Sequence, residues 1–213
     1  EIADWLTNEL LETFTQGDQG RQEFADWISQ QPGLLPWLKL KSALSIDILR
    51  DWRSIIDELP GTPKQLSAHA FMPPFSQVTG FNFGAAAAIC DSLSPKFYTM
   101  HWCLMVNQWG RWLLAGNSDL DESLVTGALV NLLQLADAEP ASATLDDFAY
   151  PAPDQPHPIG SQAQQIKIEE VCRAVAGQAK VFPLVHGSGP VDDIERRFSI
   201  AAIKETDGVW VPR

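Results

Sequence analysis

The stretch FYTMHWCLMVNQWGRWLL, residues 97 to 114, decides the fold class, because a long apolar run here carries regularly spaced large side chains. Tyr98, Trp102, Met105, Trp109 and Trp112 are four, three, four and three residues apart, which places them on one face of a helix. Apolar residues also occupy the opposite face, a pattern typical of a helix that is covered on both sides. The stretch therefore predicts a central helix whose aromatic stripe belongs to the core.

The residues on either side of this stretch resemble helix boundaries. Ser94-Pro95 precedes it, and a serine before a helix can accept from a free backbone amide while a proline at the first position loses no bond. Gly116-Asn117 follows it and indicates the end of the helix. The alternative is a hairpin that turns at residues 107–110, where Gly110 would take the left-handed position. Length and the Ser-Pro signal favour the helix.

The chain before this stretch also has helical periodicity. Leu49, Trp52, Ile56 and Leu59 are three and four residues apart between charged residues, which predicts one apolar stripe on a solvated helix. The segment 60–80 is rich in proline and is predicted to be an ordered loop. The block 81–137 is predicted to form three successive helices, the last of which begins near Ser118 and Asp121.

The chain after this block changes in character. Five prolines interrupt 138–160, which makes this segment the clearest boundary in the sequence. We expect a helix at 166–175, a short strand at 180–185, and a hairpin that pairs 198–203 with 209–211. The predicted fold is mainly α (α+β): a multi-helix core over 1–137, a proline-rich connector over 138–160, and a small α/β appendage with a short hairpin over 161–213. The appendage is also the expected point of truncation, because the sequence stops within an apparent strand.

Composition excludes several classes of function. The 213 residues carry a formal net charge of −12, so the mean field repels nucleic acids and anionic lipid surfaces. No apolar run reaches the roughly 20 residues that a membrane helix needs. Cys90, Cys103 and Cys172 are odd in number and lack CxxC spacing, which favours a reducing compartment. We therefore expect a cytoplasmic protein without a membrane span and without a cofactor.

The leading hypothesis for function is a non-catalytic protein-interaction or assembly subunit of a cytosolic complex. Eight tryptophans are many for a core of this size, and tryptophan is favoured at interfaces. Trp5, Trp27 and Trp37 lie near helix breakers in the N-terminal region and are the candidates for a patch that faces a partner. The partner is expected to be another protein or a second copy of this chain.

The first alternative is an enzyme that acts on a small molecule, with a site near the loop HGSGP at 186–190. This loop follows a short apolar strand and locally resembles the strand-then-HG turn of α/β-hydrolases, whose backbone amides help to form an oxyanion hole. The sequence has no GxSxG motif, so the resemblance ends there. In this hypothesis His186 is the base, and Arg111 or Arg196 binds an anionic substrate. For Arg111, a structural ion pair with Asp91, Asp119 or Asp121 is the simpler expectation.

The second alternative is a ligand sensor with an aromatic pocket formed by Trp102, Trp109, Trp112 and His101. A metal site is not expected. His101 and Cys103, with His69 and Cys90, supply ligand types for zinc, but side chains two positions apart on a helix point about 200° apart and do not converge on one ion. The simpler interpretation is a core histidine beside a small buried cysteine.

Overall fold

The computed structural model describes residues 2–137 and 143–211. It confirms the predicted mainly helical α+β class. The chain forms two compact units, each assembled from separate stretches of sequence. The first unit comprises Glu1–Gln31, Thr99–Gln164 and Ser188–Asp193, and the second comprises Pro32–Tyr98, Gln165–Gly187 and Ile194–Arg213. The division of the chain at 138–160 stays a prediction, and residues 138–142 of that connector lie outside the described ones.

The first unit is helical. Its elements are η1 (Ala3–Trp5), α1 (Asn8–Phe14), α2 (Gly17–Gln30), α6 (Thr99–Gly116), α7 (Glu122–Leu132) and η2 (Leu145–Phe148). The side chain of Thr7 caps α1, and the carboxylate of Asp121 accepts from the amides of Ser123 and Leu124 to cap α7. The apolar faces of these helices meet in a core that includes Ala3, Leu6, Leu11, Phe14, Leu113, Leu120, Val125 and Ala128.

The predicted central helix is confirmed as α6, whose buried residues occupy both faces and include Met100, Trp102, Cys103, Val106 and Leu113. At Gly110 a Cβ atom would meet the side chain of Leu145 in η2, so a larger residue there would require Leu145 to shift. Asn107 donates to the backbone oxygen of Leu145 at 2.7 Å and fixes the same contact.

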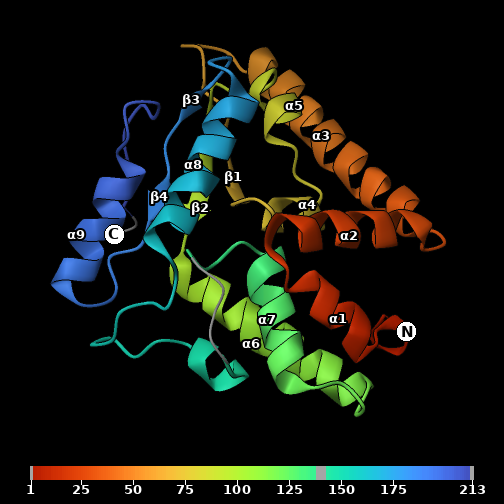
Figure 1. Ribbon diagram of the computed structural model, residues 1–213. Coiled ribbons are helices and arrows are strands. Elements are labelled where there is room, and N and C mark those ends of the chain that lie inside the picture. Colours follow the sequence, from red (N-terminus) through yellow and green to blue (C-terminus); the bar gives the residue numbers. More distant parts are fainter. Residues whose placement is uncertain (1, 138–142, 212–213) are drawn as a thin grey trace. The chain divides into compact units, whose positions relative to one another are not determined.

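The second unit is built on a small sheet. Its elements are α3 (Leu34–Glu58), β1 (Ser67–Phe71), α4 (Phe75–Thr79), α5 (Phe83–Ala87), β2 (Ser92–Phe97), β3 (Lys180–Val181) and β4 (Leu184–Val185). It also takes in most of α8 (Ser161–Val175) and α9 (Val191–Ala201), whose first turns belong to the first unit. β2 is the central strand, because β1 pairs with one of its edges and β3 and β4 with the other (Figure 1).

Among the described residues every strand pairing is parallel. Ala70 lies opposite Pro95, Leu93 opposite Val181, and Trp210 forms an isolated bridge with Leu184. The predicted strand at 180–185 and helix at 166–175 are confirmed as β3, β4 and part of α8.

Four predictions about local structure are wrong. Ser94 and Pro95 lie inside β2 instead of starting a helix, because pairing with strands distant in sequence overrides the local signal; Ser94 is fully buried and its hydroxyl donates to the oxygen of Phe182 at 2.7 Å. For the same reason the block 81–137 is not wholly helical, and the loop 60–80 contains β1 and α4.

The hairpin predicted for 198–203 and 209–211 is the fourth. Residues 198–201 belong to α9, whose buried side chains Asp193, Arg197 and Ala201 recur every four residues. Alternating apolar residues over such a short span fit a strand or a helix equally well. Trp210 pairs with β4 in parallel, so the strand contacts of this region are not those of a hairpin.

Candidate interaction surface

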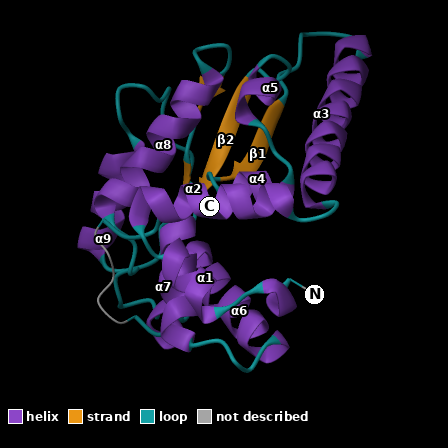
Figure 2. Ribbon diagram, turned by 45° about the vertical axis from the view of Figure 1, so that its right-hand side comes forward, coloured by secondary structure: helices purple, strands orange, loops and turns teal. Residues whose placement is uncertain are grey.

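The longest helix of the second unit, α3, is also the least covered one. Of its 25 residues only Ile46 is buried. In both views α3 lies to the β1 side of the sheet instead of across its face (Figure 1, Figure 2). An amphipathic helix is normally stabilised by burying its apolar face. Because α3 buries so little of its length, we looked for the surface that covers its apolar side chains.

The exposed side of α3 carries a continuous row of large apolar side chains. Their spacing is three or four residues from one end of the helix to the other, so they form a single stripe. Each has between 48% and 58% of its surface exposed. The members of this α3 stripe are Trp37, Leu40, Leu44, Ile48, Trp52, Ile55 and Leu59.

Contacts near both ends of α3 hold it against the rest of the second unit. Gly80, with φ of 81°, lies so close to the helix that a Cβ atom there would be 2.7 Å from the carbonyl carbon of Lys41. The Lys41 ammonium donates to the oxygen of Val78. Near the other end of the helix, Arg53 donates to Asp91 at 2.9 Å. The Arg53 bond holds α3 on its inner side. The Lys41 ammonium lies 4.4 Å from the ring centre of Trp37, so at this end one edge of the α3 stripe borders the contact with α4.

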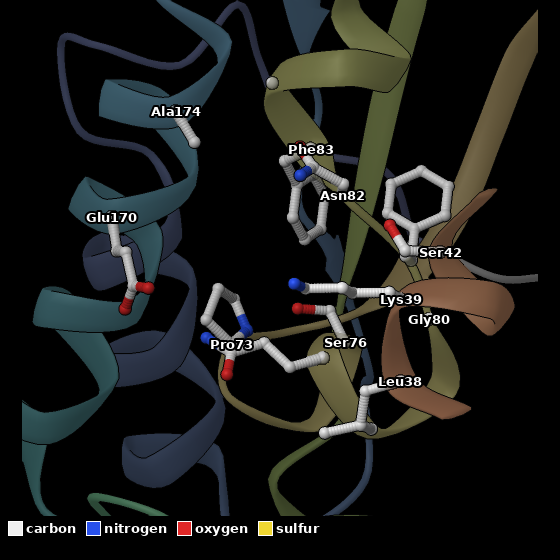
Figure 3. A pocket seen from close by; sticks show the side chains of 13 residues that line it. Leu38, Lys39, Ser42, Pro73, Ser76, Gly80, Asn82, Phe83, Glu170 and Ala174 are labelled. Atoms are coloured by element: carbon white, nitrogen blue, oxygen red, sulfur yellow. The ribbon is translucent and has the colours of Figure 1, made fainter. Parts of the chain in front are cut away.

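The inner side of α3 is not tightly packed either. A pocket of about 360 Å³ is lined by Leu38, Lys39 and Ser42 of α3 together with residues of α4, α5 and α8. Figure 3 shows Lys39 pointing from α3 toward the middle of this pocket and Glu170 on the opposite wall, on α8. A pocket with an ammonium and a carboxylate on opposite walls is suited to water or a small polar molecule rather than to a continuation of the core.

Charge along the α3 stripe is asymmetric. Asp47, Asp51 and Glu58 are four and seven residues apart and lie along one edge of the stripe. Asp47 shares an ion pair of 2.9 Å with Arg50, and both side chains are more than half exposed. Arg53, which bonds Asp57 and Asp91, faces the inner side, and the hydrogen bond that it donates to Asp57 raises its pKa above the ordinary value. The exposed edge of the stripe is therefore acidic.

The three tryptophans predicted to face a partner lie in different environments. Trp37 is half exposed and begins the α3 stripe. Trp5 is 44% exposed in η1 of the first unit. Trp27 packs against Phe14 and Phe24 at 5.9 Å between ring centroids and contributes to the core of that unit.

The stripe itself was only partly visible in the sequence. Of the four residues predicted to form it, Trp52 and Leu59 are exposed, whereas Leu49 and Ile56 are half-buried on the inner side. The whole stripe is found only when the periodicity is examined over the full run from Trp37 to Leu59. A short window of sequence does not distinguish two apolar faces that lie next to each other on one helix.

The tryptophans proposed for an aromatic ligand pocket differ in burial although they share one helical face. Trp102 is fully buried, Trp109 is half-buried and Trp112 is 59% exposed. Trp112 lines a separate pocket of about 280 Å³ at the end of α6, together with Ile2, Ala3, Ala115 and Gly116. His101 is half-buried. The ligand-sensor hypothesis stays a prediction.

Of the residues proposed for catalysis, His186 and Arg196 belong to the second unit. His186 follows β4, and its ring lies 5.2 Å from that of Tyr98 in an edge-to-face contact. The arginine that contacts it is Arg197, which is fully buried and donates to the His186 carbonyl at 2.9 Å. Arg196, the arginine predicted to bind a substrate near this loop, is half-buried. Adjacent arginines on a helix point in different directions, and one sequence does not tell which of them faces inward.

Arg111, the other candidate, belongs to the first unit and is exposed. It forms the expected structural ion pair, but with Asp146 at 2.5 Å instead of Asp91, Asp119 or Asp121. Asp146 lies in η2, beside the close contact at Gly110, and this contact between distant segments was not foreseen.

Cysteine and histidine side chains near α6 are engaged in structural contacts. Thr99 and His157 form a buried hydrogen bond of 2.5 Å, and the Cys103 thiol donates to the oxygen of Thr99 at 3.4 Å. Burial raises the pKa of Cys103 to about 12, which keeps it protonated. Within 2–137 and 143–211, no group of three or more potential ligands among His, Cys, Asp and Glu is placed to hold a metal ion.

Comparison with family models, with curated proteins and with solved structures found no match. Within the same described ranges, no helix is both long and apolar enough to cross a membrane.

Proposed function

We propose that this protein is a protein-interaction or assembly subunit that binds its partner through the α3 stripe. The observation that supports the proposal is the row of seven large apolar side chains, each about half exposed, along a helix with one buried residue. Contiguous exposed apolar surface on this scale is typical of interaction sites in soluble proteins. Helix-in-groove recognition uses anchors spaced by three and four residues, as here.

The energy available from covering the stripe is large enough for a specific complex. Complete burial of a side chain of this kind contributes about 1.5–3 kcal/mol, so covering the exposed half of seven contributes roughly 5–10 kcal/mol. Association itself costs several kcal/mol in lost freedom of motion. The stripe would therefore supply the apolar centre of an interface of ordinary strength, with Trp37 and Trp52 as its anchors.

The acidic edge of the stripe defines the partner's chemistry. Asp47, Asp51 and Glu58 line it, and the whole chain carries a formal charge of −12, so a second copy would present the same repelling charges. The complementary surface is an amphipathic helix of another protein, with an apolar stripe flanked by lysine or arginine. The same charges disfavour an anionic membrane surface as the occupant.

A cytoplasmic location belongs to the same proposal. Cys90, Cys103 and Cys172 are free thiols, the first two buried, as expected for a protein that is kept in a reducing compartment. Burial is the main cause that raises the pKa of each, so these thiols would resist oxidation.

The proposal is tested by photo-crosslinking of the full chain in its native cells. A photoreactive residue at Ile48, the centre of the stripe, should give a stoichiometric adduct with one protein of defined mass. The matched control is Ala43, which is exposed on the same helix but lies outside the stripe. A second pair of variants, Ile48→Glu and Ala43→Glu, adds the same charge at the two positions. Only Ile48→Glu should abolish the complex in native mass spectrometry.

Three outcomes would refute the proposal or part of it. Equal crosslinking at the two positions, or none, means that the stripe is not an interface. A complex that survives Ile48→Glu places the partner elsewhere. A dimer of identical chains in sedimentation experiments, abolished by the same variant, keeps the interface but overturns the basic partner.

A further inference from the structure

The two faces of the sheet in the second unit differ sharply in composition. Neighbours that are paired in register point to the same side, and successive residues alternate. One face carries small and apolar side chains, almost all of them buried: Ala68, Ala70, Leu93, Pro95, Phe97, Val181 and Val185. This is the ordinary composition of a sheet face that helices cover.

The other face is polar and aromatic. His69 pairs with Ser94, Phe71 pairs with Lys96, and Lys96 pairs with Leu184, so these residues share it. Tyr98 and His186, whose rings touch, are the next positions on the same side, beyond the ends of β2 and β4. We call His69, Phe71, Lys96, Tyr98 and His186 the polar sheet face. Parallel sheets are normally apolar on both sides, which makes this composition unusual.

Charge on the polar sheet face is opposite to that of the chain. The strand residues 67–71, 92–97, 180–181 and 184–185 include no carboxylate, whereas the protein as a whole has 27 acidic residues. Lys96 is half-buried, and its ammonium lies 5.2 Å from the ring centre of Phe71. Among the described residues Lys96 takes part in no ion pair. An ammonium in this setting is available to a ligand.

His69 lies beside this lysine, and its surroundings favour the neutral imidazole. Its partial burial and the nearby Lys96 charge both lower its pKa, burial more than charge. Its ring lies 5.3 Å from that of Trp210, which in turn stacks on Phe182 at 5.8 Å. A neutral imidazole can donate one hydrogen bond and accept another, and the indole beside it offers a flat apolar surface.

The location of these groups within the sheet is also informative. Phe71 is the last residue of β1, Lys96 is the penultimate residue of β2, and Tyr98 and His186 come directly after strand ends. Ligands of parallel α/β sheets bind at the carboxyl ends of the strands, where the side chains of several strands converge.

We propose that the polar sheet face is a binding site for a small organic oxyanion. The Lys96 ammonium pairs with the anionic group, His69 offers a hydrogen bond to it, and Phe71 and Trp210 contact the apolar part of the ligand. Phosphate and carboxylate groups both satisfy this chemistry. The site lies on strands and is separate in sequence from the α3 stripe, so the two proposals stand or fall independently.

The test uses the full chain with phenyl phosphate and benzoate as probes, and the same titration with phosphate and acetate to measure what the ring adds. Binding is followed by NMR of the histidine side chains. We expect millimolar or tighter binding of at least one aromatic probe, with a change in the His69 signals. A bound anion beside His69 also raises its pKa, the opposite of what Lys96 does.

Variants of two lysines in the same sheet provide the control. Lys96→Gln should weaken binding of the probe by about tenfold to a hundredfold, because one charge-assisted hydrogen bond to the anion is lost. Lys96→Arg keeps the charge and should retain binding. Lys180→Gln removes a lysine from the exposed amino end of β3 and should change nothing.

Absence of binding for every probe, or equal binding by Lys96→Gln and Lys180→Gln, overturns the proposal. If phenyl phosphate binds and benzoate does not, the anionic group of the ligand is a phosphate. The reverse result assigns a carboxylate. Circular dichroism of each variant distinguishes loss of the site from loss of the fold.

Discussion

α6 and α3 are both long helices, both contain tryptophans at helical spacing, and yet they have opposite environments. α6 buries seven of its residues, including all of Trp102, whereas α3 buries only Ile46 and leaves Trp37 and Trp52 about half exposed. The polar residues of α6 made it resemble a functional site, but it is the centre of the first unit. α3 looked like an ordinary helix against a core, but it carries seven large apolar side chains that are about half exposed.

The difference shows what helical periodicity does and does not tell. Spacing of three and four residues establishes that an apolar face exists. What covers that face depends on segments that are distant in sequence, such as η2, whose Leu145 fits against Gly110 of α6. Four substitutions, from the largest expected effect to the smallest, test whether the two helices really differ in this way.

Trp102→Ala should have the largest effect. It removes a fully buried side chain from α6 and should lower the free energy of unfolding by about 3–5 kcal/mol. Urea denaturation followed by circular dichroism measures this change. The control is Trp112→Ala on the same helical face, where the side chain is 59% exposed and the change should stay within about 1 kcal/mol. Similar losses for the two variants would mean that α6 is not covered as described.

Gly110→Ala should be the next most destabilising. The added methyl group meets the Leu145 side chain, and overpacking of this kind costs about 1–3 kcal/mol. In a Leu145→Ala background, which makes room for the methyl group, the same substitution should cost less. A double-mutant cycle by urea denaturation gives the coupling, and simple additivity would argue against the contact.

Asp121→Asn tests the capped start of α7, which packs against α6, whereas α3 starts at Gly33 without a side-chain cap. Hydrogen bonds from Ser123 and Leu124 lower the pKa of Asp121 in the folded state. A depressed carboxyl pKa contributes stability above the unfolded value of about 3.9 and loses it as the pH falls through the folded value.

Asparagine also caps helices but does not titrate. The variant should therefore show a melting temperature that falls less steeply than that of the natural chain below about pH 4. Melting curves from neutral pH downward measure this difference. Two parallel curves would show that the cap contributes nothing to acid sensitivity.

Ile48→Ala should have the smallest effect on the isolated protein. Its side chain is already 55% exposed, so we expect a change in unfolding free energy within about 0.5–1 kcal/mol. A loss of several kcal/mol in the same urea assay would show that the α3 stripe is covered within the chain. When a partner is added, the natural chain should gain stability by mass action and the variant should gain less.

Sequence alone found much of the fold and only part of the candidate surface. Helices α6, α7 and α8 were predictable because apolar spacing and caps such as Asp121 are local signals. β1 and β2 were missed, since the pairing that orders Ser94 and Pro95 comes from strands far away in sequence. Trp37 was predicted to face a partner because helix breakers lie near it in the sequence. The exposure of the other stripe residues depends on whether another segment of the chain packs against them, which the sequence does not show.

The candidate chemistry followed the same rule. His186 stood out because of its glycine-rich loop, and His69 was considered only as a possible zinc ligand. Lys96 had no local signal at all. Its position beside His69 and Phe71 arises from the register of β1 and β2, which a single sequence does not determine.

The parallel pairing of β2 has a consequence for synthesis on the ribosome. The second edge of β2 is covered only after Val181, the partner of Leu93, has been synthesised. The segment between these two residues includes α6 and α7 of the other unit. A nascent chain that ends after Leu132 already holds η1, α1, α2, α6 and α7, but β2 pairs only with β1 at that stage. The first unit can therefore assemble its helices early, while β2 keeps one edge open until the last third of the chain emerges.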